Sequence, residues 1–423
     1  MVKRYGILLL IMLTLVFVVA GCGSKEGAGD KQGTDNTQDQ ADKTDGTKEV
    51  ETETLVLGLA TTLSGTAADW GNGQVWAAEE AANQVNEHGG IELDGKKYLF
   101  DVVAYDNKYT AAEGSKVAQT LVRKDKVNYI VGTVGSAPTL AVQSITEPAK
   151  ILMLSTAWSS EAKGTGKPYT FTSLNTPLEV CEPMYGWIAK QYPDAKSVAM
   201  LNANDATGKD TAKVAKDVWT NLGIEVLVDE YYSRGTTEFS AIVTKIIAAN
   251  PDIIDLGATP PGDAGLIFKG LKEQGWDGVK LVTAGTSVAN LVDAAPEAVE
   301  GVYLGLSPDF TSDKASPVQR ELEKKYNQET GGHLNAISVS SYDAVQALVE
   351  AIKQANSIKS EDLLKVLPNI TFESSYGPSG FGGAEQYEIP QQMLLPITIT
   401  EIQNGVGVEV SRVLPKELEE KLK

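Results

Sequence analysis

The apolar residues of this chain occur in short runs that alternate with longer stretches of helical periodicity. In the stretch 74–87, for example, Val75, Ala78 and Ala82 fall on one face of a helix, which the glycines after His88 end. Strands that alternate with helices predict a parallel sheet with helices on both faces. In the first part of the pattern the predicted strands are 55–60, 99–105, 129–131 and 151–154, and the predicted helices are 74–87, 111–126 and 138–147.

The same alternation restarts after a stretch predicted to be a loop, 171–183. It predicts a second α/β unit of similar size, followed by further helices and a β-rich tail at 394–410. The strands expected here are 197–201, 224–230, 253–256, 280–284 and 302–306, and the helices are 209–222, 237–249, 265–274, 288–294, 316–329, 338–354 and 361–367.

Two similar units with material left over at the end predict an α/β fold of two doubly wound parallel-sheet lobes. We expect three strands of chain to join the lobes as a hinge, near residues 171–176, 305–308 and 376–380. The predicted segments are 55–173 and 306–377 for lobe 1, and 174–305 and 378–423 for lobe 2 and the C-terminal tail.

The N-terminus has the pattern of a secretory signal. Lys3 and Arg4 precede an uncharged apolar run at 7–20, which is too short to span a bilayer comfortably and ends in small residues before Cys22. Ala-Gly-Cys resembles the lipobox of bacterial lipoproteins, which predicts a signal peptide at 1–21 and acylation of Cys22. The alternative is ordinary cleavage nearby with an incidental cysteine.

The segment 22–54 supports a tether. After Cys22 it is built from small, polar and charged residues and has Val50 as its only large apolar side chain. Such a composition buries too little apolar surface to offset the entropy of ordering, so we expect a disordered linker. The folded part would then be lipid-anchored at the extracytoplasmic face of the cell membrane.

Composition excludes several classes of function. The formal net charge is -19, and an acidic protein repels phosphate backbones, so nucleic acid is not an expected partner. Cys181 is predicted to be a lone buried thiol, and His88 and His333 lie next to glycine pairs without metal-like spacing. The chain has no Gly-x-Ser-x-Gly motif, and the glycines near Gly71 do not complete a dinucleotide-binding loop. We therefore expect no catalytic residues, no metal and no cofactor.

Four loops that follow predicted strands carry the candidate chemistry, because ligands of open parallel sheets bind outside the carboxyl ends of the strands. They read TTLSGTAADWG from Thr61, GTVGSAPT from Gly132, STAWSS from Ser155 and NANDATG from Asn202.

These loops, in this order and spacing, resemble the branched-chain amino-acid-binding (Leu/Ile/Val-binding) family of type I periplasmic binding proteins, which feed ABC importers. LATTLSGTAADWG, NEHGGI, a strand ending YDN, IVGTVGSAPT and ILMLSTAWSS resemble its first lobe, and NANDATGKD and GATPPGDAGLIFKGLKEQGW its second. The resemblance covers nearly everything from Leu55 onward.

For the first lobe the resemblance implies five ligand-binding residues. Ser136 stands where a glycine-rich loop opens a helix and where the family binds the ligand carboxylate; a plain helix N-cap is the alternative. Ala157 and Ser159 match positions that contact the ligand's polar head, or else form a turn. Trp70 matches an aromatic wall of the cleft and Trp158 lies in the third loop, although either could pack within its own lobe.

The second lobe departs from the family pattern. Thr207 and Pro260 stand where amino-acid binders often have aromatic residues, and the loop after 280–284 lacks the acidic residue that pairs with a ligand ammonium. Asp205 or Asp263 could replace it, or could be solvated loop carboxylates. A carboxylate without an amine, or an aromatic acid stacked on tryptophan, therefore remains open as the ligand.

The resemblance implies a monomeric binding protein that captures a small carboxylate-bearing solute between its lobes. It would deliver this amino acid or related organic or aromatic acid to the permease and ATPase subunits of an ABC importer. The alternative is a sensing subunit that presents its ligand-bound form to a membrane receptor or kinase, and the sequence does not separate the two.

Overall fold

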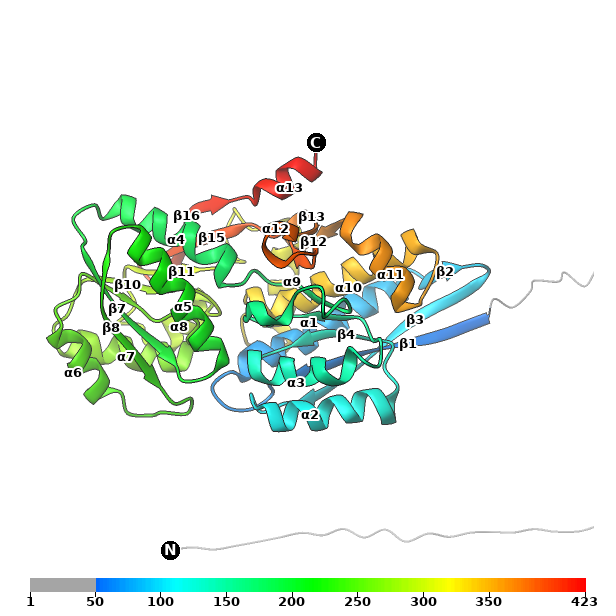
Figure 1. Ribbon diagram of the computed structural model, residues 1–423, viewed down its shortest axis with the longest axis horizontal. Helices are drawn as coiled ribbons and strands as arrows, with labels where there is room; N and C mark the ends of the chain where they lie inside the picture. The colour runs from blue at the N-terminus through cyan, green and yellow to red at the C-terminus, as the bar shows by residue number, and fades with distance from the viewer. Residues whose placement is uncertain (1–50) are drawn as a thin grey trace, which may run out of the picture. The chain divides into compact units, whose positions relative to one another are not determined.

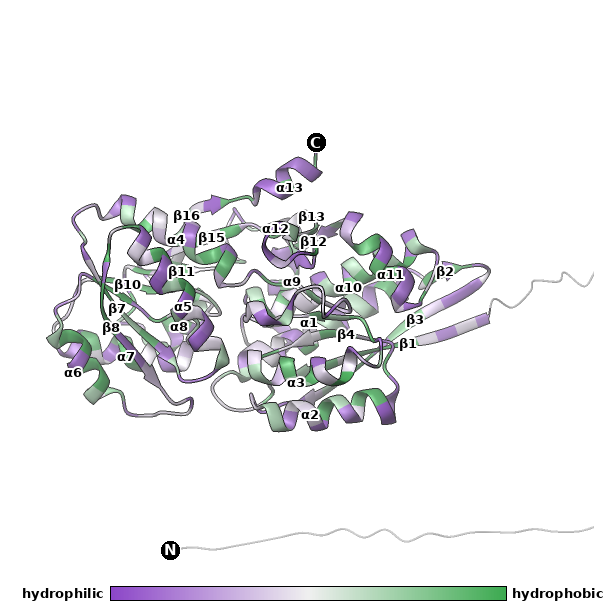
Figure 2. Ribbon diagram, viewed as in Figure 1, coloured by the Kyte–Doolittle hydropathy of each residue, from purple (hydrophilic) through white to green (hydrophobic). Residues whose placement is uncertain are grey.

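The structure is a computed structural model that describes residues 51–423, and within them the chain builds two β-sheets flanked by helices (Figure 1). The expected signal peptide and Cys22 lie outside the described residues, as does most of the expected linker. Strand β1 begins at Glu51 rather than at residue 55. Its first residues are exposed and hydrophilic (Figure 2), but their backbone pairs with β3 and Glu51 forms an ion pair with Lys96 at 3.0 Å. The predicted linker, 22–54, therefore ends too late, because composition alone does not show that residues 51–54 pair as a strand.

The first sheet has nine strands. Its centre is parallel, whereas β2, β12 and β13 run antiparallel to their neighbours. In sheet order the strands are β12 (Thr371–Ser374), β13 (Gly377–Gly382), β14 (Gln392–Met393), β6 (Thr170–Thr172), β5 (Met153–Ser155), β4 (Tyr129–Thr133), β1 (Glu51–Thr61), β3 (Lys96–Asp106) and β2 (Ile91–Leu93).

The second sheet has seven strands. Five are parallel, and β15 and β16 extend the sheet as an antiparallel pair. Their order is β16 (Val406–Val413), β15 (Ile397–Gln403), β11 (Val302–Gly305), β10 (Val279–Val282), β9 (Ile253–Asp255), β7 (Ser197–Ala203) and β8 (Glu225–Tyr232).

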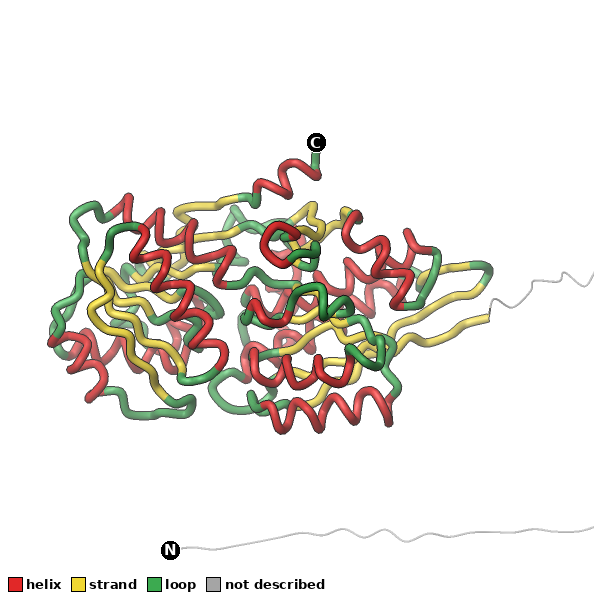
Figure 3. The backbone as a smooth tube through the Cα atoms, in the orientation of Figure 1, coloured by secondary structure: helices red, strands yellow, loops and turns green. Residues whose placement is uncertain are grey.

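Helices lie alongside both sheets (Figure 3). They are α1 (Ala68–Glu87), α2 (Ala111–Gln119), α3 (Ser136–Thr146), α4 (Pro177–Gln191), α5 (Ala206–Asn221), α6 (Ser240–Ala248), α7 (Pro261–Glu273), α8 (Val288–Ala294), α9 (Pro317–Thr330), α10 (Ala336–Ala355), α11 (Ser360–Val366), α12 (Ala384–Tyr387) and α13 (Lys416–Lys421), with short helical turns η1 (Thr120–Asp125), η2 (Ser160–Ala162) and η3 (Leu367–Asn369).

Side-chain alternation along the strands explains why helices cover both faces. In β1, Leu55, Leu57 and Leu59 pack with residues of α1 and α10, whereas Val56 and Ala60 pack with residues of α2 and α3. Strand β7 repeats this arrangement, with alternate residues facing α6–α8 and α4–α5. Each sheet is therefore doubly wound, as the sequence predicts.

The chain passes between the sheets at the first two expected places. It leaves β6 for α4 at 173–176, and it leaves β11 after Leu306, which still bonds to Thr398 of β15, to reach Phe310 in the first core.

The third crossing was predicted in the wrong place, at 376–380. Residues 375–376 form the tight turn of a hairpin, and Gly377 starts β13, which pairs with β12 and β14 in the first sheet. The crossing lies at 394–396, between β14 and β15, so the first lobe extends well past residue 377. Helix α13 then returns to the first lobe, where Glu417 accepts a hydrogen bond from the Gly383 backbone N–H at 2.8 Å.

The stretch 171–183, expected to be a loop, contains β6 and the first half of α4. Pro177 occupies the first turn of this helix, where a missing N–H has no consequence, and Glu179 accepts a hydrogen bond from the Thr176 N–H at 2.7 Å. A threonine, a proline and a glutamate at this spacing are typical of a helix start, so the prediction of a loop here is wrong.

Among the described residues, no helix is both long and apolar enough to cross a membrane.

Candidate functional site

The loops at the carboxyl ends of the two sheets meet around a small cavity of about 30 Å³. Residues of both lobes line it, and among those described none carries a charge. The first lobe contributes Trp70, Tyr109, Val134, Gly135, Thr156, Trp158, Leu174 and Ile337, and the second contributes Thr207, Ala258, Ala284 and Gly285.

Ser136 is fully buried beside this cavity and is the first residue of α3. Gly135, with a φ of 88°, holds the N-cap position, and no side chain caps this helix. The Ser136 hydroxyl instead accepts hydrogen bonds from the Ser159 N–H at 3.1 Å and from the Thr207 hydroxyl at 2.9 Å. The N-cap interpretation of Ser136 is therefore wrong, and its hydroxyl faces the other lobe.

Thr207 reaches across from α5 to the backbone N–H and the hydroxyl of Ser136. Its Oγ1 accepts from the Ser136 backbone nitrogen at 3.2 Å, donates to the Ser136 hydroxyl and lies 3.1 Å from the hydroxyl oxygen of Tyr109. One hydroxyl of the second lobe thus occupies a pocket formed by a hydroxyl, an amide and a phenol of the first. An oxygen of a carboxylate could take the same place, with the Ser136 hydroxyl then donating to it rather than accepting.

The two tryptophans predicted to line the cleft also bridge the lobes. The Trp70 indole N–H donates to the carbonyl oxygen of Gly285, and the Trp158 N–H donates to Thr211 at 2.7 Å. Gly285 has a φ of 88°, and a Cβ there would lie 3.0 Å from the Trp70 ring. A glycine at this position lets the indole approach the second lobe closely.

Two buried amides fix the first-lobe loops. The Asn107 side chain donates to the carbonyl oxygens of Ala60 and Val134, at 2.8 Å each, so it ties the ends of β1, β3 and β4 together. The Gln74 side chain accepts from Thr61 at 2.8 Å and donates to Thr156 at 3.2 Å. The cavity wall is thus held by side chains that leave the cleft itself apolar.

Four of the seven predicted ligand-binding residues do not line the cavity. Ser136 and Ser159 lie beside it, where the Ser159 N–H donates to the Ser136 hydroxyl. Ala157 is buried between Thr156 and Trp158, and Pro260 is buried at the start of α7, just beyond Ala258. Several lining residues were missed. Tyr109 follows the strand ending in YDN, so the rule that ligands meet strand ends could have identified it, whereas Leu174 and Ile337 come from segments without a local signal.

The two candidate acidic residues differ in their surroundings. Asp205 caps α5 by accepting from the Gly208 N–H at 2.9 Å, and it also pairs with Arg234. Asp263 is 1 % exposed, and one of its oxygens has no hydrogen-bond partner among the described residues. Burial raises the pKa of Asp263, although Tyr232 and Arg234 oppose this shift.

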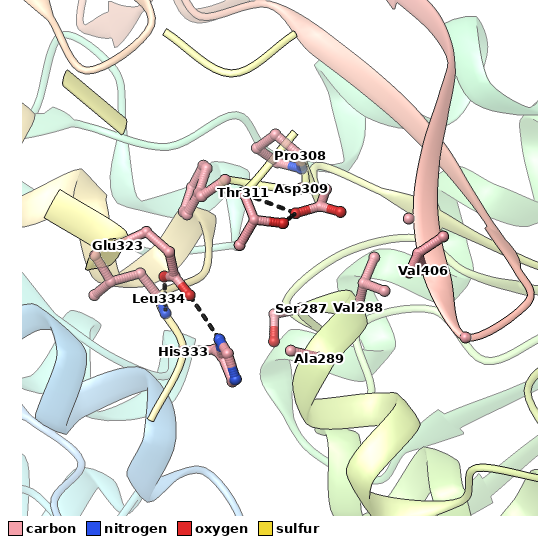
Figure 4. A pocket seen from close by; sticks show the side chains of 13 residues that line it. Ser287, Val288, Ala289, Pro308, Asp309, Thr311, Glu323, His333, Leu334 and Val406 are labelled. Carbon is pink, nitrogen blue, oxygen red and sulfur yellow. Dashed lines mark hydrogen bonds and ion pairs between the residues drawn. The ribbon is translucent and has the colours of Figure 1, made fainter. Parts of the chain in front are cut away.

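A larger cavity of about 150 Å³ lies elsewhere, between the start of α8, the turn after β15 and the segment around His333 (Figure 4). There Glu323 binds the His333 ring nitrogen Nδ1 at 2.6 Å and the Leu334 N–H at 2.8 Å. His333 is thus partly buried, and none of the predicted ligand-binding residues lines this second cavity.

Comparison with known proteins finds relatives that match most of this chain. A family model described as periplasmic binding protein matches residues 54–405. A leucine-, isoleucine-, valine-, threonine- and alanine-binding protein of Pseudomonas aeruginosa is 27% identical over 334 residues, which are 78% of this chain and 86% of that protein.

Solved structures share the fold. A branched-chain amino acid transporter substrate-binding protein of Streptococcus pneumoniae in complex with isoleucine has a TM-score of 0.72 and 21% identity, covering 86% of this chain and 100% of that one. An ABC transporter solute-binding protein of R. palustris in complex with benzoate has a TM-score of 0.73 and 19% identity, covering 86% and 97%. The matched proteins bind solutes and are not enzymes, which confirms the expected class.

Proposed function

Because the chain belongs to the family of periplasmic binding proteins, we propose that it binds a small carboxylate-bearing solute between its lobes and delivers it to an ABC importer. The solute would be an amino acid or a related organic or aromatic acid. The family implies an extracytoplasmic location and an ABC transporter as partner. Lipidation of Cys22, which lies outside the described residues, would anchor a monomeric protein to the membrane.

The observation that carries this proposal is the convergence of polar groups at Ser136 within an aromatic wall. A carboxylate oxygen that replaced the Thr207 hydroxyl would accept from the Ser136 N–H and hydroxyl and from Tyr109. Trp70 and Trp158 would then contact an aliphatic side chain or a ring. The P. aeruginosa relative is named for amino acids and the R. palustris structure contains benzoate, and both kinds of ligand combine a carboxylate with an apolar body.

An amino acid or an aromatic acid is larger than the present cavity, so the lobes must separate before it binds. The present cavity has room for about one or two water molecules, whereas pockets for small ligands measure roughly 300 Å³ or more. The three connecting segments at 173–176, 307–309 and 394–396 would form the hinge. Closure would then bring Thr207 and Gly285 against the ligand from the second lobe.

The test is a thermal-shift screen of amino acids, short carboxylates and aromatic acids, followed by calorimetry on the best ligand. A ligand at one hundred times its dissociation constant stabilises the folded form by about 2.7 kcal/mol. Ser136→Ala should weaken that ligand by about tenfold to a hundredfold, because one charge-assisted hydrogen bond contributes roughly 1.5–3 kcal/mol. Unchanged affinity in this variant would contradict the assignment of Ser136.

A further inference from the structure

Arg234 places a guanidinium group between the lobes without acceptors for two of its nitrogens. It follows β8, its side chain is 14 % exposed, and its Nε donates to Asp205. Nη1 and Nη2 are both buried and have no hydrogen-bond partner among the described residues. On the other side of the cleft, the guanidinium carbon lies 4.2 Å from the centre of the Tyr109 ring.

The group is charged in this position. Burial opposes the charge, but Tyr109, Asp205 and Tyr232 together raise the Arg234 pKa above its ordinary value. Buried charged donors that lack acceptors are strongly unfavourable, and most buried polar groups in folded proteins are paired. Stacking on Tyr109 and the single bond from Nε to Asp205 leave Nη1 and Nη2 of the guanidinium unpaired. These two nitrogens require an acceptor that the described residues do not supply.

The guanidinium that carries these two unpaired nitrogens is connected to the Ser136 pocket by direct contacts. Arg234 stacks on Tyr109, the Tyr109 hydroxyl meets Thr207, and Thr207 donates to the Ser136 hydroxyl and accepts from the Ser136 N–H. Separation of the lobes would uncover Ser136 and Arg234 together, because Tyr109 belongs to the first lobe and both Thr207 and Arg234 belong to the second. Both groups therefore face the same opening.

We propose that Nη1 and Nη2 of Arg234 bind a second carboxylate of the ligand, so that the solute is a dicarboxylate spanning Ser136 and Arg234. The planar fork of a guanidinium matches the two oxygens of a carboxylate, and such bidentate pairs are among the stronger hydrogen bonds in proteins. This inference rests on the proposed function, because it assigns the second end of a ligand whose first end binds Ser136. Two acidic groups lie near this second carboxylate: Asp205, which pairs with the Nε of Arg234, and Asp263, whose pKa burial raises.

The test compares matched acids by isothermal titration calorimetry on the purified protein. The pairs are terephthalate with benzoate, adipate with hexanoate, and glutamate with norvaline. We expect the dicarboxylate of at least one pair to bind tenfold or more tightly than its partner. Arg234→Gln should abolish this preference and Arg234→Lys should retain part of it, while Arg123→Gln, a change of an exposed arginine, should leave it intact.

The outcomes separate this inference from the proposed function. If monocarboxylates bind as well as dicarboxylates and Arg234→Gln weakens both equally, Arg234 serves lobe closure alone and the dicarboxylate assignment is wrong. If no acid in the screen or in these pairs binds, the proposed function itself fails. The comparison on the unaltered protein decides the first question even if Arg234→Gln does not fold.

Discussion

Asp343 on α10 is a fully buried carboxyl group whose pKa burial raises to about 7, although the Ser375 N–H and hydroxyl donate to it at 2.5 and 2.9 Å. In the unfolded chain an aspartate titrates near 3.9. Between about pH 4 and 7 the folded state therefore holds a proton that the unfolded state has lost, and stability falls as the pH rises through this window.

Asp343→Asn should remove this dependence. Asparagine is uncharged and can both accept from the Ser375 N–H and bond to its hydroxyl, so the variant should match the unaltered protein at pH 4 and exceed its free energy of unfolding by roughly 2–4 kcal/mol at pH 8. Urea unfolding at both values measures the difference. Asp313→Asn, at an exposed aspartate, is the control; a parallel response of both variants would refute the role of Asp343.

Helices α2 and α3 follow one another in the chain, with η1 and β4 between them, and they differ in how they are capped. The Thr110 side chain accepts from the Glu113 N–H at 3.2 Å and caps α2, whereas α3 starts at Gly135 and Ser136 without a side-chain cap. Sequence alone left the two roles of Ser136 open, because a serine at a helix start fits both.

Thr110→Ala should lower the free energy of unfolding by about 1 kcal/mol and leave ligand affinity unchanged. Ser136→Ala should weaken ligand binding by about tenfold to a hundredfold, whatever stability it also loses with the hydrogen bonds from Ser159 and Thr207. Denaturation curves and calorimetry on both variants form a matched pair, since each change removes one hydroxyl near the start of a helix. Unchanged affinity of Ser136→Ala, as in Thr110→Ala, would leave Ser136 with a structural role alone.

Periodicity predicted the elements that pack by alternation or by a helical face, such as β1, β7, α1 and α10. It failed where pairing or capping decides the structure. Strand β13 carries glycine and proline, yet it pairs with β12 and β14, and α4 starts at a proline that its first turn tolerates. Likewise Leu174 and Ile337, which line the cavity, are far apart in the sequence, and only the tertiary fold brings them together.

Across the whole molecule, hydrogen bonds of Trp70, Trp158 and Thr207 help to hold the lobes together around a cavity too small for the proposed ligand. The indole N–H of Trp70 bonds to Gly285, Trp158 bonds to Thr211, and Thr207 bonds to Ser136 and Tyr109. Each hydrogen bond contributes a net stabilisation of only about 0.5–1.5 kcal/mol, so loss of a few would shift the balance between closed and open forms.

Thr207→Val tests this balance, because it keeps the shape of the side chain and removes the hydroxyl that bonds to the Ser136 hydroxyl and N–H. Without ligand, the variant should populate the open form more and show a larger radius of gyration in small-angle scattering. A carboxylate ligand supplies its own oxygen to Ser136, so saturation should restore the compact form in the variant as in the unaltered protein. Identical scattering of the two proteins without ligand would mean that Thr207 does not hold the cleft shut, and a lack of compaction with a ligand that stabilises the protein would contradict the hinge.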